Sequence, residues 1–425
     1  MDLKRLGVLG VSAVLLITAC NSGGSGGTGG GGTAVKIGIE LPMTGGEAPN
    51  GVPTANGVQL ALKQITVNGY TVTIEQEDDA VNGVHNADQG AKNMQTLAND
   101  PAVIGVVGPF NSSVAQAEIP VSNAAGLMQC SPANTNPGLT QGDAAKALRQ
   151  TNPDKIAYVR VATTDLQQGA AGADIAFNVV GAKTAYVLDD TQTYGKGIAD
   201  VFAQTFTSLG GTVVGRDGVS DTTTDFTSYV TKIAGLKPDY VYYGGVTTSG
   251  LGLFRKQMDQ QGLSNIPFGG GDGINDGSAA TASSFLNIVG ASGDANTYST
   301  VAAVHDIPNA SKFSSDYMAQ FNSAPGAYSA PAYACAQVIL QALGAAGGIT
   351  DLAKLREAVR SYIATPSNTY DTVLGTISFD ANGDTSQHTI SYYKYDATAK
   401  DWVFFKQRDL TADPLTGGAS PSASQ

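Results

Sequence analysis

The sequence predicts an α/β protein with two lobes, each built on a doubly wound parallel sheet. Short apolar runs alternate with helical patterns in two consecutive series, as in repeated βαβ units. Residues 102–107 are apolar at almost every position, which is typical of a strand covered on both faces. The chain has 425 residues, of which 42% are hydrophobic, so it can bury two hydrophobic cores.

The first series of alternating patterns precedes residue 131. Its strands are expected at residues 35–41, 70–75, 102–107 and 127–130. Its helices, marked by apolar residues at helical spacing, are expected at 51–67, at 86–99 and from about Ser112 onward.

The second series repeats this order, and the C-terminal part departs from it. Strands of the second series are expected at 184–189, 212–215, 240–243 and 266–268, and helices at 197–209, 224–234 and 250–261. The C-terminal part is expected to form helices at 311–321, 333–345 and 351–363 and strands at 373–379, 389–395 and 402–406. Asn382-Gly383 is a strong turn signal between the first two of these strands.

The two ends of the chain do not read as parts of the fold. A basic start followed by a short apolar run at 6–19 is typical of a signal peptide, which we predict at 1–19. The run is not a membrane span, because 14 residues are too few to cross a bilayer. The run ends at Cys20 in a pattern that resembles the lipobox of bacterial lipoproteins, which implies lipidation of this cysteine; the alternative is an ordinary secretory peptide. Residues 20–34 read as a Gly/Ser-rich tether, and 411–425 as a disordered tail.

Composition and motifs exclude several classes of function. The formal net charge of −12 opposes binding to nucleic acid. Three His and three Cys argue against a His-rich metal site and a disulfide scaffold, and we expect no cofactor. No G-x-S-x-G motif follows a predicted strand, and the chain contains no Walker A or H-E-x-x-H motif. Residues 380–384 begin like a calcium loop, but Thr385 stands where Gly is required and no Glu closes the loop. We therefore expect a protein that is not an enzyme.

Polar loops follow three of the predicted strands, where ligands bind in open α/β sheets. Residues 108–113 contain Asn and Ser at a helix start, 131–137 are rich in hydroxyls and amides, and Asp272 lies among glycines. Taken singly, these are ordinary caps, turns and solvated loops. Together, donors on one lobe and a carboxylate on the other would suit a zwitterion such as an α-amino acid.

At these residues the chain resembles the type I periplasmic substrate-binding proteins, in particular the leucine/isoleucine/valine-binding group that serves branched-chain amino acid ABC transporters. The matching stretches cover most of residues 35–406 in the family's order and are 37–45, 76–79, 104–113, 126–140, 189–199, 225–245, 268–273 and 370–384.

The resemblance implies how the amino-acid head group is bound. Ser112 and Thr135 match positions whose hydroxyl and backbone N–H groups bind the ligand carboxylate. Ala133 matches the position whose carbonyl helps to hold the ammonium group. Asp272 stands where the family has an acidic residue, usually Glu, that pairs with this ammonium group.

The resemblance also implies which residues line the cleft, and the chain differs from the family at two of these positions. Tyr194 and Tyr328 match aromatic positions that line the cleft, and Phe110 matches an apolar one. Asn50 and Val246 stand where branched-chain binders commonly have an aromatic residue. These losses leave the head-group site intact and open the possibility of a different ligand side chain.

The family fold implies a three-stranded hinge between the lobes. Lobe 1 is expected to contain 35–164 and 303–373, and lobe 2 165–302 and 374–410. The expected function is that of an extracytoplasmic, lipid-anchored, monomeric solute-binding protein that delivers an amino acid, branched-chain or related, to an ABC permease. The alternatives are an amide, urea-like or aromatic-acid ligand on the same fold, or a sensory receptor module.

The family disulfide of the first lobe has no counterpart, because Val81 and Asn111 replace its cysteines. Cys130 and Cys335 remain, at a predicted strand end and in a predicted helix. An exported protein permits a bridge between them. We expect two buried free thiols, because buried Cys behaves as a small hydrophobic residue.

Overall fold

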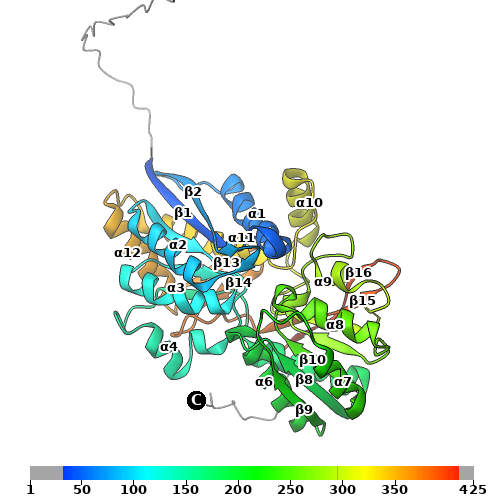
Figure 1. Ribbon diagram of the computed structural model, residues 1–425. Helices are drawn as coiled ribbons and strands as arrows, with labels where there is room; N and C mark the ends of the chain where they lie inside the picture. Colours follow the sequence, from blue (N-terminus) through cyan, green and yellow to red (C-terminus); the bar gives the residue numbers. More distant parts are fainter. Residues whose placement is uncertain (1–31, 294, 411–425) are drawn as a thin grey trace, which may run out of the picture. The chain divides into compact units, whose positions relative to one another are not determined.

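The computed structural model describes residues 32–293 and 295–410 (Figure 1). The predicted signal peptide, Cys20 and the predicted tail at 411–425 lie outside the described residues. Of the predicted tether at 20–34, residues 33 and 34 belong to the first strand, β1 (Thr33–Leu41). In the part of the chain that the structure describes, no helix has the length and apolarity needed to cross a membrane.

The first sheet has five parallel strands in the order β2-β1-β5-β6-β7. Besides β1, its strands are β2 (Tyr70–Asp78), β5 (Val103–Val107), β6 (Gln129–Ser131) and β7 (Tyr158–Arg160). The helices packed around it are α1 (Ala48–Gln64), α2 (Ala87–Asn99), α3 (Ser112–Ala125), α4 (Gly142–Leu148), α10 (Ala310–Phe321), α11 (Ser329–Ala346) and α12 (Leu352–Ile363).

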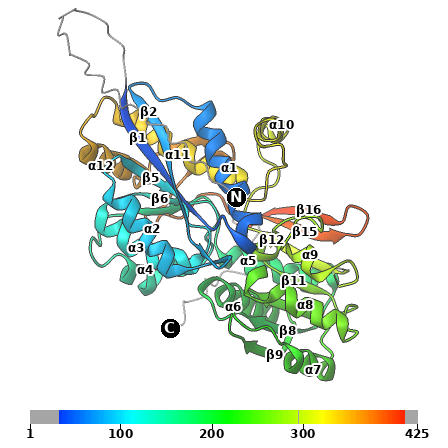
Figure 2. The same ribbon diagram turned by 45° about the horizontal axis from the view of Figure 1, so that its top comes forward.

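Strand β5 is buried on both faces, as its apolar run predicts. Ile104 and Val107 belong to the core that contains α1 and α11, whereas Val103 and Val106 belong to a second core with α2. Figure 2 shows α1 and α11 on one side of this sheet and α2 and α3 on the other. A helical layer on each face is the physical reason for the absence of polar residues in this strand.

The second sheet repeats the strand order of the first and adds two antiparallel strands, β15 and β16. Its order is β16-β15-β12-β11-β10-β8-β9. The strands are β8 (Thr184–Asp189), β9 (Thr212–Gly218), β10 (Tyr240–Gly244), β11 (Phe268–Gly270), β12 (Thr297–Val301), β15 (Thr389–Asp396) and β16 (Asp401–Asp409).

Most helices of the second sheet start after its strands, as βαβ units require, whereas α5 follows β7 of the first sheet. The helices are α5 (Asp165–Asp174), which continues as a π-helical stretch η3 (Ile175–Val180), α6 (Thr193–Ser208), α7 (Thr227–Leu236), α8 (Leu251–Gln260) and α9 (Phe285–Val289). Short 3-10 turns are η1 (Gly45–Glu47), η2 (Pro137–Leu139), η4 (Thr247–Ser249) and η5 (Asp272–Ile274).

Two small hairpins complete the fold, and one of them differs from the prediction. They are β3 (Ala80–Val81) with β4 (Val84–His85), and β13 (Thr369–Thr372) with β14 (Gly375–Ser378). The single strand expected at 373–379 is therefore a turn and a strand of this second hairpin. The turn at Asn382-Gly383 closes only one bridge, Phe379 to Thr385, because β15 pairs with β12 and β16 instead.

The segment after β14, assigned to the second lobe from the sequence, contacts the first sheet. The backbone N–H of Arg160 in β7 donates to the carbonyl of Gly383 (3.1 Å), and its guanidinium forms an ion pair with Asp384 (2.7 Å). Figure 1 shows β13 and β14 among the elements of the first sheet and β15 with β16 in the second. The passage to the second sheet therefore lies between Asp384 and the start of β15.

The expectation of two free thiols is wrong. Cys130 in β6 and Cys335 in α11 form a disulfide, with their Cα atoms 5.5 Å apart. Both residues are fully buried in the core between α11 and the first sheet. The helix passes directly over the strand end, a long-range contact that the sequence alone does not reveal.

Candidate functional site

A cavity lies at the carboxyl ends of the strands of both sheets. The empty space among its lining residues is about 400 Å3, a figure that includes open solvent. The loops that line it follow β5 and β6 of the first sheet and β8, β10 and β11 of the second. The lining residues are His85, Phe110, Asn111, Ser112, Ser113, Ala133, Thr135, Asp190, Gln192, Tyr194, Val246, Asp272 and Gly273.

The wall from the first sheet offers hydrogen-bond donors. Ser112 is the first residue of α3, and the backbone N–H groups of a first helical turn have no partner within the helix. Ala133 and Thr135 lie in the loop after β6 and are almost fully buried. The Ser112 hydroxyl accepts the backbone N–H of Asn136 (3.4 Å), and the Asp165 N–H donates to the Thr135 carbonyl (2.8 Å). The first of these bonds links the two loops, and the second ties the loop after β6 to the first residue of α5.

Two side chains fix these loops to each other. The Ser131 hydroxyl donates to the Pro109 carbonyl (2.8 Å) and accepts the backbone N–H of Asn134 (2.9 Å). The Asn134 side chain donates to the Phe110 carbonyl (2.7 Å). Such contacts order the wall before any ligand arrives, which lowers the entropic cost of binding.

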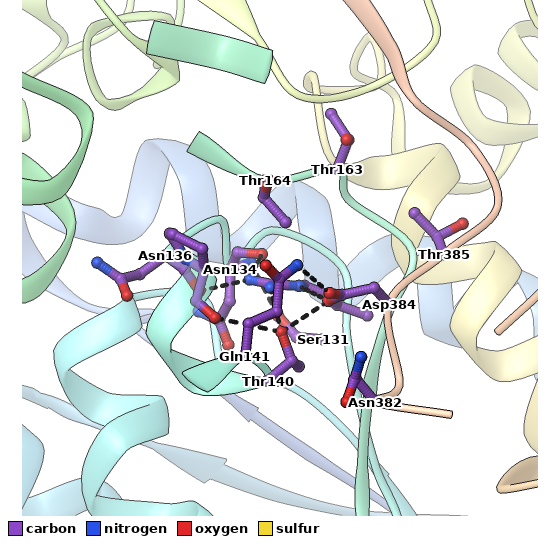
Figure 3. A network of polar contacts seen from close by, with 12 residues as sticks. Ser131, Asn134, Asn136, Thr140, Gln141, Thr163, Thr164, Asn382, Asp384 and Thr385 are labelled. Carbon is purple, nitrogen blue, oxygen red and sulfur yellow. Dashed lines mark hydrogen bonds and ion pairs between the residues drawn. The ribbon is translucent and has the colours of Figure 1, made fainter. Parts of the chain in front are cut away.

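A buried Arg supports the same wall from below. Arg160 donates to the Asn136 carbonyl (2.7 Å) and to the Thr140 hydroxyl (2.6 Å), and its Nε lies 2.7 Å from Asp384 Oδ1. Figure 3 shows Thr140 and Gln141 pointing toward Asp384, to which both donate. Burial alone would raise the pKa of Asp384, but the facing Arg160 lowers it, so this carboxylate stays ionised.

Asp272 provides the carboxylate on the second sheet's side of the cavity. Its Oδ1 accepts hydrogen bonds from Tyr194 (2.7 Å) and Gln168 (2.7 Å), and its Oδ2 accepts one from Tyr328 (2.6 Å). Burial raises the pKa of Asp272, while the three donors oppose this rise. A buried carboxylate held in this way attracts a cationic group into the cavity.

Of the remaining sequence-predicted residues, three line the cavity and two do not. Phe110, Tyr194 and Val246 line it. Tyr328 does not line it but packs edge-on against Phe110, with ring centroids 5.3 Å apart, and binds Asp272. Asn50 lies in the first turns of α1 outside the lining, where its carbonyl accepts the Thr54 hydroxyl.

The cavity wall also contains His85, Asp190 and Gln192, to which the sequence assigned no role, and Asn111 from the predicted polar loop 108–113. Asp190 directly follows the predicted strand at 184–189, so its position after a strand could have indicated it. His85 lies in the two-residue strand β4, which has no readable period. Among the described residues, no group of three or more His, Cys, Asp or Glu is arranged to hold a metal ion.

Comparisons with known proteins agree with this architecture. Residues 34–400 match the family model described as periplasmic binding protein. A Leu/Ile/Val-binding protein of Rhizobium johnstonii is 29% identical over 370 residues, which are 85% of this chain and 92% of that protein.

Two solved structures show the same fold. A leucine-binding protein of Thermotoga maritima matches with a TM-score of 0.73 and 27% identity, over 89% of this chain and 99% of that one. A solute-binding protein of an ABC transporter from Rhodopseudomonas palustris, in complex with 3,4-dihydroxybenzoic acid, matches with a TM-score of 0.69 and 22% identity, over 90% and 99% of the two chains. The family model spans most of the chain, and the chain belongs to the periplasmic binding protein family, whose members bind substrates and are not enzymes.

Proposed function

We propose that this protein is an extracytoplasmic solute-binding lipoprotein of an ABC importer that binds an α-amino acid in the cavity. This proposal rests on one observation: a carboxylate from the second sheet's side and hydrogen-bond donors from the first sheet's side line the same cavity. Asp272 offers a buried carboxylate to an ammonium group, and Ser112, Thr135 and the start of α3 offer donors to a carboxylate. The names of the related proteins support the same class of ligand.

The two sheets with their helices act, in this proposal, as the two lobes of a clamp joined by a hinge. Contacts already link them beside the cavity. The Asn136 side chain donates to the Thr193 carbonyl (2.7 Å), and the Thr193 hydroxyl donates to Gln116 Oε1 (2.7 Å). A ligand that touches both lobes favours the closed state by its differential contacts, and the permease receives that state.

Calorimetric titration of the purified protein tests the ligand class. The panel contains the common L-amino acids, their decarboxylated and deaminated analogues, simple amides, urea and benzoates. We expect binding of at least one amino acid and a large loss for analogues that lack either head group. Tight binding of an uncharged solute or of a benzoate, without binding of any amino acid, would reject the proposal.

Uptake and membrane anchoring are tested in cells. We expect Cys20→Ala to release the protein from the membrane fraction and deletion of the cognate permease to abolish uptake of the ligand. If the ligand instead changes signalling while its uptake is unaffected, the protein is a receptor module.

A further inference from the structure

Three polar residues that are not part of the head-group site also line the cavity. We call His85, Asn111 and Asp190 the polar wall; all three line the cavity, and none takes part in the head-group site described above. Aliphatic ligand side chains are bound by apolar surfaces, so a wall of this kind raises the question of which ligand side chain it fits.

His85 lines the cavity and has one ring nitrogen bound to a carboxylate. Its Nδ1 lies 3.0 Å from Oε1 of the buried Glu47, an oxygen that also accepts the hydroxyl of Thr248 from the second sheet's side. Among the described residues, none is hydrogen-bonded to His85 Nε2. Burial alone would lower the pKa of His85, but Glu47 raises it, which favours the imidazolium. In the imidazolium form, Nε2 carries a proton and can donate it to a hydrogen bond.

Asn111 presents the complementary group. It precedes α3, yet its side chain does not cap this helix. Its Oδ1 is buried, and no group of the described residues donates to it. A buried amide oxygen without a donor is uncommon in proteins, and here it lies in the lining of a ligand cavity.

The charges around the polar wall oppose a second ligand carboxylate, and the imidazolium of His85 opposes a ligand cation placed beside it. Glu47 and His85 balance each other as a pair, and Asp190 adds a carboxylate whose pKa burial raises to about 6, so it is mostly ionised at neutral pH. Asp190 is held by the Ser249 hydroxyl (2.6 Å) and the Gln192 backbone N–H (3.0 Å). A second ligand carboxylate would face Asp190, and a second ligand cation would face His85.

We infer that the bound amino acid carries an uncharged carboxamide side chain, as in asparagine or glutamine. Its carbonyl oxygen accepts from His85 Nε2, and its amide N–H donates to Asn111 Oδ1. This inference rests on the proposed amino-acid function and names the side chain for it. An aliphatic side chain of the same shape would leave both groups without partners, at a cost of about tenfold in affinity for each.

The test uses ligands that share one heavy-atom skeleton. Asparagine, leucine and aspartate differ in the ends of side chains of almost the same shape, and glutamine extends the series by one methylene. Calorimetry of the full protein should give affinities for asparagine or glutamine at least tenfold tighter than for leucine and aspartate. Leucine binding as tightly as both amides would overturn the inference and leave amino-acid binding intact, whereas binding of no amino acid would reject both.

A variant pair tests the role of His85. His85→Leu should lower affinity for the preferred amide at least tenfold and raise the leucine-to-amide affinity ratio. The matched control is His305→Leu, since His305 is exposed and stacks on Phe404 far along the chain from the cavity lining. If His85→Leu binds the amide and leucine in the same ratio as the unaltered protein, His85 does not read the side chain. The ligand series on the unaltered protein decides the inference if this variant does not fold.

Discussion

Replacing Asp272 by asparagine removes the charge of the head-group site and keeps its shape. Asp272 is 7% exposed and accepts three hydrogen bonds, from Tyr194, Gln168 and Tyr328. A ligand ammonium group beside it therefore forms a charge pair that water does not screen.

The expected loss follows from the burial of this pair. Removal of one partner from a buried, hydrogen-bonded charge pair costs about 2–5 kcal/mol. Since about 1.4 kcal/mol is a factor of ten, Asp272→Asn should weaken amino-acid binding at least about 30-fold. The unliganded variant should still fold, because the tyrosine hydroxyls can donate to the new amide oxygen or accept from its N–H groups.

Isothermal titration calorimetry measures this loss, and thermal unfolding without ligand checks the fold. The control is Asp259→Asn, which alters a carboxylate on α8 that binds Ser292 and does not line the cavity. An Asp272→Asn protein that binds its amino acid within threefold of the unaltered protein would show that this carboxylate does not hold the ammonium group.

Three further predictions concern stability. Cys335→Ala removes the disulfide to Cys130, which joins residues 205 positions apart. In urea titrations it should lower the free energy of unfolding by up to about 5 kcal/mol. An unchanged unfolding midpoint after reduction of the unaltered protein would contradict this prediction. Burial raises the pKa of Glu40 to about 7, so the contribution of its protonated form to stability is complete below the unfolded-state pKa of about 4.3 and is lost as the pH rises to 7. Glu40→Gln should therefore reduce the decline of the unfolding free energy between these pH values. An equal decline in both proteins would contradict this prediction. Asp384→Asn leaves Arg160 without its buried partner and should cost about 3–5 kcal/mol of unfolding free energy, whereas a loss below 1 kcal/mol would mean that this pair is dispensable.

The sequence determined the α/β class and much of the site, because both depend on short-range patterns. The apolar run of β5 requires helices on both faces, and ligands bind beyond the carboxyl ends of such strands. Reading the loops after the strands therefore led to Ser112, Thr135 and Asp272, which the fold brings to one cavity.

Tertiary structure decided the features that depend on contacts between distant residues. The disulfide joins residues separated by 205 positions, and Arg160 meets Asp384 across 224. His85 reaches the cavity from a two-residue strand that has no period, whereas Asn50, in the first turns of α1, does not line it. Local sequence patterns indicate which residues of a strand or helix are buried. The residues from distant segments that they contact are determined only when the whole chain packs.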